Sequence, residues 1–285
     1  MRIKHLKKLT VFIGLLCILL FVQQTVLAST STSATSSKTP NSTNTGISTM
    51  RSKAPNSTNN LLYVFYPTDI RPKKMERHIS RYCPEINITV FAKIKDFEEQ
   101  TRRIPPEAIL SYAPVIKKNQ QYTSLVQGFK QGRSYEDYVL VSIEEKVDIS
   151  QLASIKIGVL DILGRNPMKL FISKTLRTNV KIARVTKTED ILNLLIFGLV
   201  DALFVSQQRY EKFHSQSLLP LVATKLDLKM DLAVLAVKSD KSKELFLNCF
   251  NRLGKQTNSL LGVDQWALIN EQTNRISGRW LWALK

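Results

Sequence analysis

The chain has 285 residues and carries 41 lysines and arginines against 23 aspartates and glutamates, a formal net charge of +18. Its three histidines and three cysteines form no cluster with the spacing of zinc ligands, and no glycine-rich phosphate-binding loop occurs, so neither kind of site is expected. The cationic residues are spread along the chain without a nucleic-acid motif, so we expect no nucleic-acid partner, and three explanations of the charge remain: anionic ligands, an acidic membrane or cell surface, or solubility.

The N-terminal residues have the pattern of a secretory signal peptide. A basic stretch, MRIKHLKK, is followed by an apolar run over residues 9–22 and by small residues before Ser29. The run is shorter than the roughly 20 residues of a membrane-spanning helix, which favours cleavage over a retained anchor. Cys17 lacks the small preceding residue of a lipidation site. We therefore predict a signal peptide over residues 1–28, cleavage near Ala28, and a periplasmic or secreted protein.

The next segment, residues 29–60, is rich in Ser, Thr and Asn and cannot bury enough apolar surface to offset the chain entropy of folding. A near repeat, SKTPNSTN and then SKAPNSTN, places N-glycosylation sequons at Asn41 and Asn56. We interpret the segment as a disordered linker that acts as a tether. The alternative is a glycosylated or surface-attachment stalk.

From Leu61 onward, apolar strand patterns alternate with amphipathic helix patterns. We first expect strands over 61–67, 86–94 and 135–146, a short strand that begins at residue 108 and ends at Pro114, and helices over 71–83 and 95–104. The pattern then repeats, with strands over 155–161, 180–185 and 200–206, helices over 166–176, 188–198 and 241–254, and further apolar segments over 219–224 and 231–240. Such alternation predicts an α/β protein whose mostly parallel sheets are flanked by helices, and the repetition predicts two lobes that face each other across a cleft.

Helix ends in the second half have recognisable residues. We expect Asn166 to be an N-cap with Pro167 at the first helical position, Thr188 to open a capping box, and Gly198 to end a helix. Asp201, the one carboxylate in FGLVDALFV, then begins a strand. We expect its side chain to accept hydrogen bonds from turn N–H groups, a structural role, rather than to contact a ligand.

Two segments carry a resemblance to a known family. ISQLASIKIGVLD (149–161) and LLIFGLVDALFV (194–205) resemble motifs of type 2 periplasmic (solute) binding proteins, and within them the phosphonate-binding branch is the most similar. The resemblance covers residues 61–270 and implies a two-lobe fold with the ligand in the cleft between the lobes.

The resemblance also implies how the chain is divided. Lobe 1 would consist of residues 61–137 and 229–285, and lobe 2 of residues 138–228. The lobes would close on the ligand by rotation about the crossing segments, 138–141 and 229–232.

On this fold the ligand meets strand C-termini and helix N-termini, where free N–H donors and the helix dipole favour an anion. The expected ligand-binding residues are Tyr66, Thr68, Ser111 and Tyr112 in lobe 1 and Gly164, Arg165, Asn166, Thr188, Ser206 and Gln207 in lobe 2. Arg165 would add a bidentate hydrogen bond to an anion. Each polar residue alone is also explained as part of a turn or cap, and the two tyrosines as core or rim aromatics.

The sequence departs from phosphonate-binding relatives at the place that holds the phosphonate. It has LGRNPMK (163–169) where those relatives carry a run of hydroxyl residues, and Pro167 removes one N–H donor. Thr188 stands near the position of a family histidine. Either the ligand is another anion held by Arg165, or the fold has become a sensing or adaptor module.

We expect a monomeric solute-binding protein, without cofactor or metal, that captures a small anion of the phosphonate or phosphate type for an ABC transporter. The alternative is a receptor or adaptor that presents ligand state to a membrane sensor or a surface partner. An enzyme is the weakest hypothesis, because no nucleophile with a paired base, carboxylate pair or metal set is found. Cys83 and Cys249, the cysteines that follow the signal peptide, are compatible with one disulfide or with two free thiols.

Overall fold

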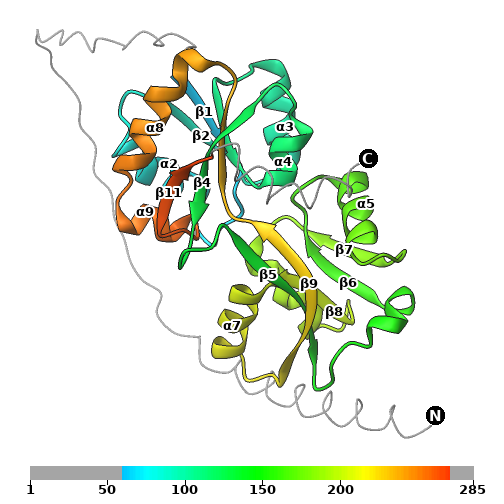
Figure 1. The fold of residues 1–285 in the computed structure, drawn as a ribbon. Coiled ribbons are helices and arrows are strands. Elements are labelled where there is room, and N and C mark those ends of the chain that lie inside the picture. The colour runs from blue at the N-terminus through cyan, green and yellow to red at the C-terminus, as the bar shows by residue number, and fades with distance from the viewer. Residues whose placement is uncertain (1–59, 270–285) are drawn as a thin grey trace, which may run out of the picture. The chain divides into compact units, whose positions relative to one another are not determined.

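The computed structural model describes residues 60–269, which form two β-sheets flanked by helices (Figure 1). The expected α/β fold with two lobes is confirmed. The predicted signal peptide (1–28), the linker apart from Asn60, and residues 270–285 lie outside the described residues. No helix within residues 60–269 is long and apolar enough to span a bilayer.

The first sheet has six strands in the order β11-β4-β10-β3-β1-β2. These strands are β1 (Leu61–Val64), β2 (Asn87–Val90), β3 (Ala108–Ser111), β4 (Thr123–Phe129), β10 (Val234–Val237) and β11 (Gln265–Leu268). The helices of the same part of the chain are α2 (Pro72–Ser80), α3 (Ile94–Arg103), α4 (Ala113–Lys118), α8 (Lys243–Arg252) and α9 (Lys255–Leu260), with the 3₁₀ helix η5 (Asp240–Ser242). We call this sheet and its helices lobe 1.

Both faces of β1 are buried, as its continuous apolar sequence predicts for a strand covered on two sides. Tyr63 shares a hydrophobic core with Phe97 of α3. Leu62, the adjacent residue, shares a different core with Phe246 of α8. Since successive side chains of a strand point to opposite faces, this strand joins the two helical layers of lobe 1.

The second sheet has five strands in the order β7-β6-β8-β5-β9. These strands are β5 (Tyr135–Ile143), β6 (Lys156–Leu160), β7 (Lys181–Val185), β8 (Ala202–Ser206) and β9 (Leu221–Asp231). The helices are α5 (Arg165–Thr175), α6 (Ile191–Ile196) and α7 (Gln207–Gln216), with the 3₁₀ helices η3 (Ile149–Ser154) and η4 (Thr188–Asp190). We call this sheet and its helices lobe 2.

Each sheet is mixed, which corrects the expectation of mostly parallel sheets. In lobe 1, β1 pairs in parallel with β2 and β3, whereas β10 pairs antiparallel with β3 and β4, and β11 antiparallel with β4. In lobe 2, β6 pairs in parallel with β7 and β8, whereas β5 pairs antiparallel with β8 and β9. The parallel strands are those joined through helices, and the antiparallel strands include those that run between the lobes.

In lobe 1, one predicted strand end was wrong and one strand was missed. The strand expected to end at Pro114 ends at Ser111, and Pro114 lies in the first turn of α4, where a missing N–H costs no helix hydrogen bond. Strand β4 was not predicted, because Gln127 and Gly128 interrupt its apolar pattern.

The chain crosses between the lobes at residues 130–134, after β4, and at residues 232–233, after β9. Residues 138–141, where a hinge was expected, instead lie inside β5 and pair with β8. The buried amide of Gln127 connects both crossings, since its Nε2 donates to the carbonyl oxygens of Ser134 (3.3 Å) and Leu232 (3.4 Å). Any rotation of the lobes therefore takes place about these two short connections.

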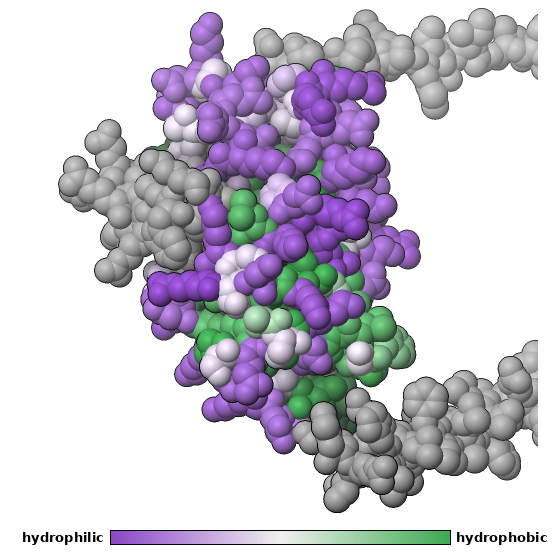
Figure 2. Space-filling model, turned by 90° about the vertical axis from the view of Figure 1, so that its right-hand side faces the viewer, coloured by the Kyte–Doolittle hydropathy of each residue, from purple (hydrophilic) through white to green (hydrophobic). Residues whose placement is uncertain are grey.

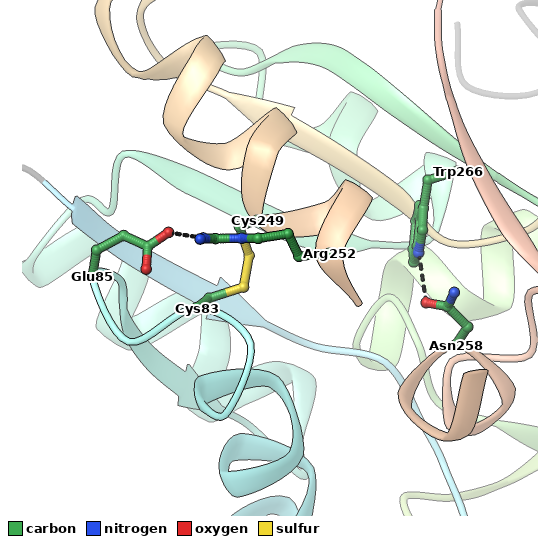
Figure 3. Close-up of a disulfide and its surroundings, with 6 residues drawn as sticks. All are labelled: Cys83, Glu85, Cys249, Arg252, Asn258 and Trp266. Atoms are coloured by element: carbon green, nitrogen blue, oxygen red, sulfur yellow. Dashed lines mark hydrogen bonds and ion pairs between the residues drawn. A yellow bond between two sulfur atoms is a disulfide. The ribbon is translucent and has the colours of Figure 1, made fainter. Parts of the chain in front are cut away.

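The two cysteines form a buried disulfide that joins α8 to the turn after α2, with 5.3 Å between the Cα atoms of Cys83 and Cys249 (Figure 3). The ion pair of Arg252 with Glu85 lies beside it. The cross-link spans a sequence separation of 166 residues. In the chain-entropy account, closing a loop of this length stabilises the folded state by about 5 kcal/mol.

Asp201 fixes the start of β8 against the neighbouring strand. Its backbone N–H donates to the carbonyl oxygen of Lys156 (2.9 Å), and its Oδ2 accepts from the N–H of Lys156 (2.8 Å). The carboxylate thus binds the first residue of β6 instead of the N–H groups of its own turn. Gly198, with φ +62°, ends α6 as expected.

Exposed hydrophobic residues are concentrated on lobe 2. Figure 2 shows them on one face of the molecule, mainly over its lower half, where the second sheet lies. The exposed hydrophobic residues of lobe 2 are Ile149, Leu170, Ile196, Phe197, Leu199 and Leu218, and those of lobe 1 are Ile104 and Leu268.

Candidate functional site

A cavity of about 230 Å³ lies between the two lobes and is lined by residues of both. From lobe 1 its lining includes Tyr66, Thr68, Asp69, Tyr112 and Gly262. From lobe 2 it includes Glu136, Tyr138, Thr188, Phe204, Ser206, Arg209 and Lys212. The cavity therefore combines aromatic rings, hydroxyl groups and four charged side chains.

The wall formed by lobe 2 follows from the register of two antiparallel strands. Tyr138 of β5 lies opposite Ser206 of β8. Residues two positions apart on a strand face the same side, so Glu136 joins Tyr138 and Phe204 joins Ser206 on the cavity side of the sheet. The carboxylate, the hydroxyl and both rings consequently line the same side of the cavity.

Two aromatic pairs line the cavity, one from each lobe. The rings of Tyr66 and Tyr112 are stacked with centroids 4.4 Å apart, and the rings of Tyr138 and Phe204 lie 4.9 Å apart. Burial raises the pKa of Tyr112 to about 12 and raises the pKa values of Tyr66 and Tyr138 well above the ordinary value. The three tyrosines are therefore neutral near pH 7 and act as rings and hydroxyl groups.

Glu136 is a carboxylate without an ion-pair partner among the described residues. Burial raises its pKa, although a hydrogen bond from the Ser206 hydroxyl and the charges of Lys130 and Arg209 act in the opposite direction. The Ser206 side chain also accepts from the N–H of Arg209 and so caps α7. The environment thus disfavours the ionised carboxylate that faces the cavity.

Asp69 has the opposite environment, with two cationic partners from the other lobe. Arg209 Nη1 donates to Asp69 Oδ1 at 3.1 Å, and Lys212 forms an ion pair with Asp69 Oδ2. Burial acts to raise the pKa of Asp69, but Lys212 and Arg209 outweigh it and lower the pKa. With the hydrogen bond from Thr188 Oγ1 to the Thr68 carbonyl oxygen (3.2 Å), these contacts hold the two lobes together at the cavity.

Five of the predicted ligand-binding residues line the cavity: Tyr66, Thr68, Tyr112, Thr188 and Ser206. Five do not: Ser111, Gly164, Arg165, Asn166 and Gln207. Ser111 is fully buried, and its hydroxyl donates to the Phe65 carbonyl oxygen at 2.6 Å, so it fixes the backbone before Tyr66. Arg165 is exposed at the start of α5, and the guanidinium that faces the cavity is that of Arg209.

The α5 N-terminus differs from expectation for a physical reason. Its N-cap is Gly164, with φ +84°, and the expected cap, Asn166, lies two residues later, inside the first turn of the helix. The nearly buried carboxylate of Asp161 accepts the Gly164 N–H at 2.8 Å and forms an ion pair with Arg184. An acidic side chain of the protein therefore occupies the region where phosphonate was expected.

Four charged residues of the cavity were not predicted from the sequence: Asp69, Glu136, Arg209 and Lys212. Glu136 could have been predicted from the strand pattern. It lies on the same face of β5 as the buried Leu140, so it is a charged residue on the face that points into the protein. Arg209 and Lys212 could not have been predicted in this way, since only the folded chain brings α7 to Asp69. No group of three or more His, Cys, Asp or Glu side chains that could hold a metal ion occurs in the described part of the chain.

No protein-family model and no curated protein matches the sequence. Solved structures do match. Two are amino acid ABC transporter substrate-binding proteins from Streptococcus pneumoniae, both bound to L-arginine and 14% identical, with TM-scores of 0.50 and 0.51; each match covers 71% of this chain and 93% or 92% of the other. A third is a Xanthomonas citri protein bound to ATP, 8% identical, with a TM-score of 0.55, covering 76% of this chain and 94% of the other.

These likenesses are fold-level, because the sequence identities are low. None of the three proteins is described as phosphonate-binding, so the expected phosphonate-binding branch has no support among them. The resemblance that does hold is the broader one. Residues 60–269 have the two-lobe fold of type 2 periplasmic solute-binding proteins.

Proposed function

We propose that the protein is an exported solute-binding protein whose lobes close around a small organic molecule and deliver it to an ABC transporter. The cavity between the lobes carries this proposal, because residues of both lobes line it and cross-lobe contacts close it. A site of this kind buries its ligand when the lobes meet and releases it when they part. The substrate-binding proteins among the fold relatives support the transporter as the partner.

The size of the cavity favours a ligand of amino-acid dimensions. Its volume of about 230 Å³ is below the roughly 300–1,000 Å³ of sites for drug-sized molecules. Its lining is partly aromatic, which suits a carbon skeleton better than an inorganic ion.

The charged side chains of the cavity disfavour the anionic ligand that was expected from the sequence. Both cations in the lining, Arg209 and Lys212, are already paired with Asp69. The fourth charged group, Glu136, would repel an anion. A phosphate or phosphonate is therefore not part of this proposal, and binding rather than catalysis is the role that we assign.

A thermal-shift screen combined with small-angle X-ray scattering tests the proposal. Purified protein would be screened against amino acids, amines, sugars, phosphate and phosphonates. A ligand at 100 times its dissociation constant adds about 2.7 kcal/mol, which raises Tm by several degrees in a domain of this size. The same compound should reduce the radius of gyration as the lobes close.

A matched pair of variants locates the binding site. Met230→Trp places a larger side chain in the cavity and should abolish the shift, whereas Leu170→Trp adds the same side chain on an exposed face of α5 and should leave it unchanged. The unliganded Tm of each variant shows whether it is folded. A folded wild-type protein that responds to no compound in the panel would contradict the proposal.

A further inference from the structure

We propose that the ligand carries an organic ammonium group, and that Glu136 and the aromatic rings of the cavity bind it. This inference rests on the proposed solute-binding function and specifies the class of solute. It covers amines, quaternary ammonium compounds and amino acids, which share the positively charged nitrogen.

The first support is the uneven pairing of the four charged side chains in the cavity. Asp69 takes up both Arg209 and Lys212, using one carboxylate oxygen for each. Glu136 lines the cavity together with the neutral hydroxyl of Ser206 and forms no ion pair with any residue in the range 60–269. A half-buried carboxylate in a partly apolar cavity is stabilised by a cationic partner, and at this position the ligand can supply it.

The second support is the set of rings around the carboxylate. Tyr138 lies two residues after Glu136 on the same strand, so both project toward the cavity. Phe204 contacts the Tyr138 ring, and the stacked Tyr66 and Tyr112 come from the other lobe. Ring faces attract cations, and this attraction is stronger where water is excluded. The rings thus favour the same charge as Glu136 does.

Because Arg209 also lines the cavity, the ligand can carry an anionic group in addition to its ammonium group. Arg209 lines the same cavity as Glu136, Tyr112 and Tyr138. Its pairing with Asp69 keeps it from neutralising Glu136 fully. A ligand with a second, anionic group can approach Arg209 while its ammonium group approaches Glu136, so the experiment must separate simple amines from amino acids.

Isothermal titration calorimetry on the purified protein tests the inference. The probes would be choline, glycine betaine, putrescine, L-lysine and L-arginine as ammonium compounds, with methylphosphonate, phosphate and glutarate as anions and glucose as a neutral solute. At least one ammonium compound should bind and the anions should not. Glu136→Gln, which keeps the shape and removes the charge, should weaken that binding by about 10- to 150-fold.

Asp137→Asn is the matched control. It makes the same change one residue later on β5, where the side chain forms only a long, exposed ion pair with Arg133 (3.7 Å) and does not line the cavity. Its affinity should equal that of the wild type. For the rings, Tyr138→Leu should weaken binding by about 2- to 30-fold, whereas Tyr138→Phe should have little effect, because it retains the aromatic face.

The outcomes separate this inference from the proposed function. An ammonium ligand whose affinity is unchanged in Glu136→Gln would overturn the role of Glu136. Binding of only anions or glucose would overturn the ammonium class and leave a solute-binding protein. Absence of binding by every probe, together with no response in the wider thermal-shift screen, would overturn both.

Discussion

Asp69 and Glu136 line the same cavity but have opposite environments. Asp69 is paired with two cations, and its pKa is lowered, whereas Glu136 forms no ion pair among the described residues, and burial raises its pKa. The difference shows that one carboxylate of a cavity can be used for contacts within the fold while another has no cationic partner within the described residues. Asp69 forms contacts between the lobes. Glu136 has no cationic partner within the described residues, so on our proposal it is available to bind the ligand.

Removing the charge of Asp69 should reduce the difference in ion pairing between Asp69 and Glu136. In Asp69→Asn, Arg209 and Lys212 lose their shared partner, and Arg209 becomes free to neutralise Glu136. We expect an ammonium ligand to bind about 2- to 30-fold more weakly, because partly exposed ion pairs contribute about 0.2–1 kcal/mol each. Calorimetry at low and high salt measures the effect.

Asp240→Asn provides the control for this change, because Asp240 forms an exposed ion pair with Lys243 and lies outside the cavity lining. It should bind ligand as the wild type does. If Asp69→Asn also retained wild-type affinity at low salt, the cross-lobe ion pairs would have no part in the ligand-bound state.

Removing the Glu136 charge should stabilise the ligand-free protein while it impairs binding. Burial raises the pKa of Glu136 in the folded protein above its ordinary value of 4.5. The stability that this shift contributes is fully present below pH 4.5, and it is lost as the pH rises through the pKa of the folded state. At pH 7, Glu136→Gln should therefore increase the free energy of unfolding, by about 0.5–2 kcal/mol. Urea denaturation without ligand measures it, and Asp137→Asn should stay within about 0.5 kcal/mol of the wild type. A decrease for Glu136→Gln would show that its carboxylate is already well compensated.

The smallest expected effect is a pH dependence that distinguishes the two carboxylates. Glu136 must be ionised to bind an ammonium group, and the groups that act on its charge are Ser206, Lys130, Arg209 and Glu211. Its pKa is raised, so affinity should fall a few-fold between pH 7.5 and pH 5, while Asp69 stays ionised until the pH falls below its ordinary 3.8. Calorimetry at both pH values checks this, and an equal fall in Glu136→Gln would assign the dependence to another group.

The fold was more predictable from the sequence than the site was. Local patterns predicted the buried strand β1, the end of α6 at Gly198 and the double α/β repeat, because each depends on neighbouring residues. The pairing of Cys83 with Cys249 was left open, since 166 residues separate them and only the tertiary fold brings them together.

The site was only half predictable, for the same reason. Half of the predicted residues line the cavity, and each of them lies next to the end of a strand or helix that the sequence pattern predicts: Tyr66, Thr68, Tyr112, Thr188 and Ser206. Arg165 was predicted because it precedes the first helix of lobe 2, and Arg209 was not considered. The sequence could not reveal that Asp161 already occupies that helix start or that Asp69 meets α7 across the cleft.

The Cys83–Cys249 disulfide has a topological consequence. It closes the intervening chain into a covalent ring, and all of lobe 2, from β5 to β9, is part of that ring. A protease that cleaves one exposed loop of lobe 2 therefore opens the ring without releasing a fragment, and the two pieces part only after reduction. A protein with this connectivity can be cleaved once in its second lobe and still remain a single covalent molecule.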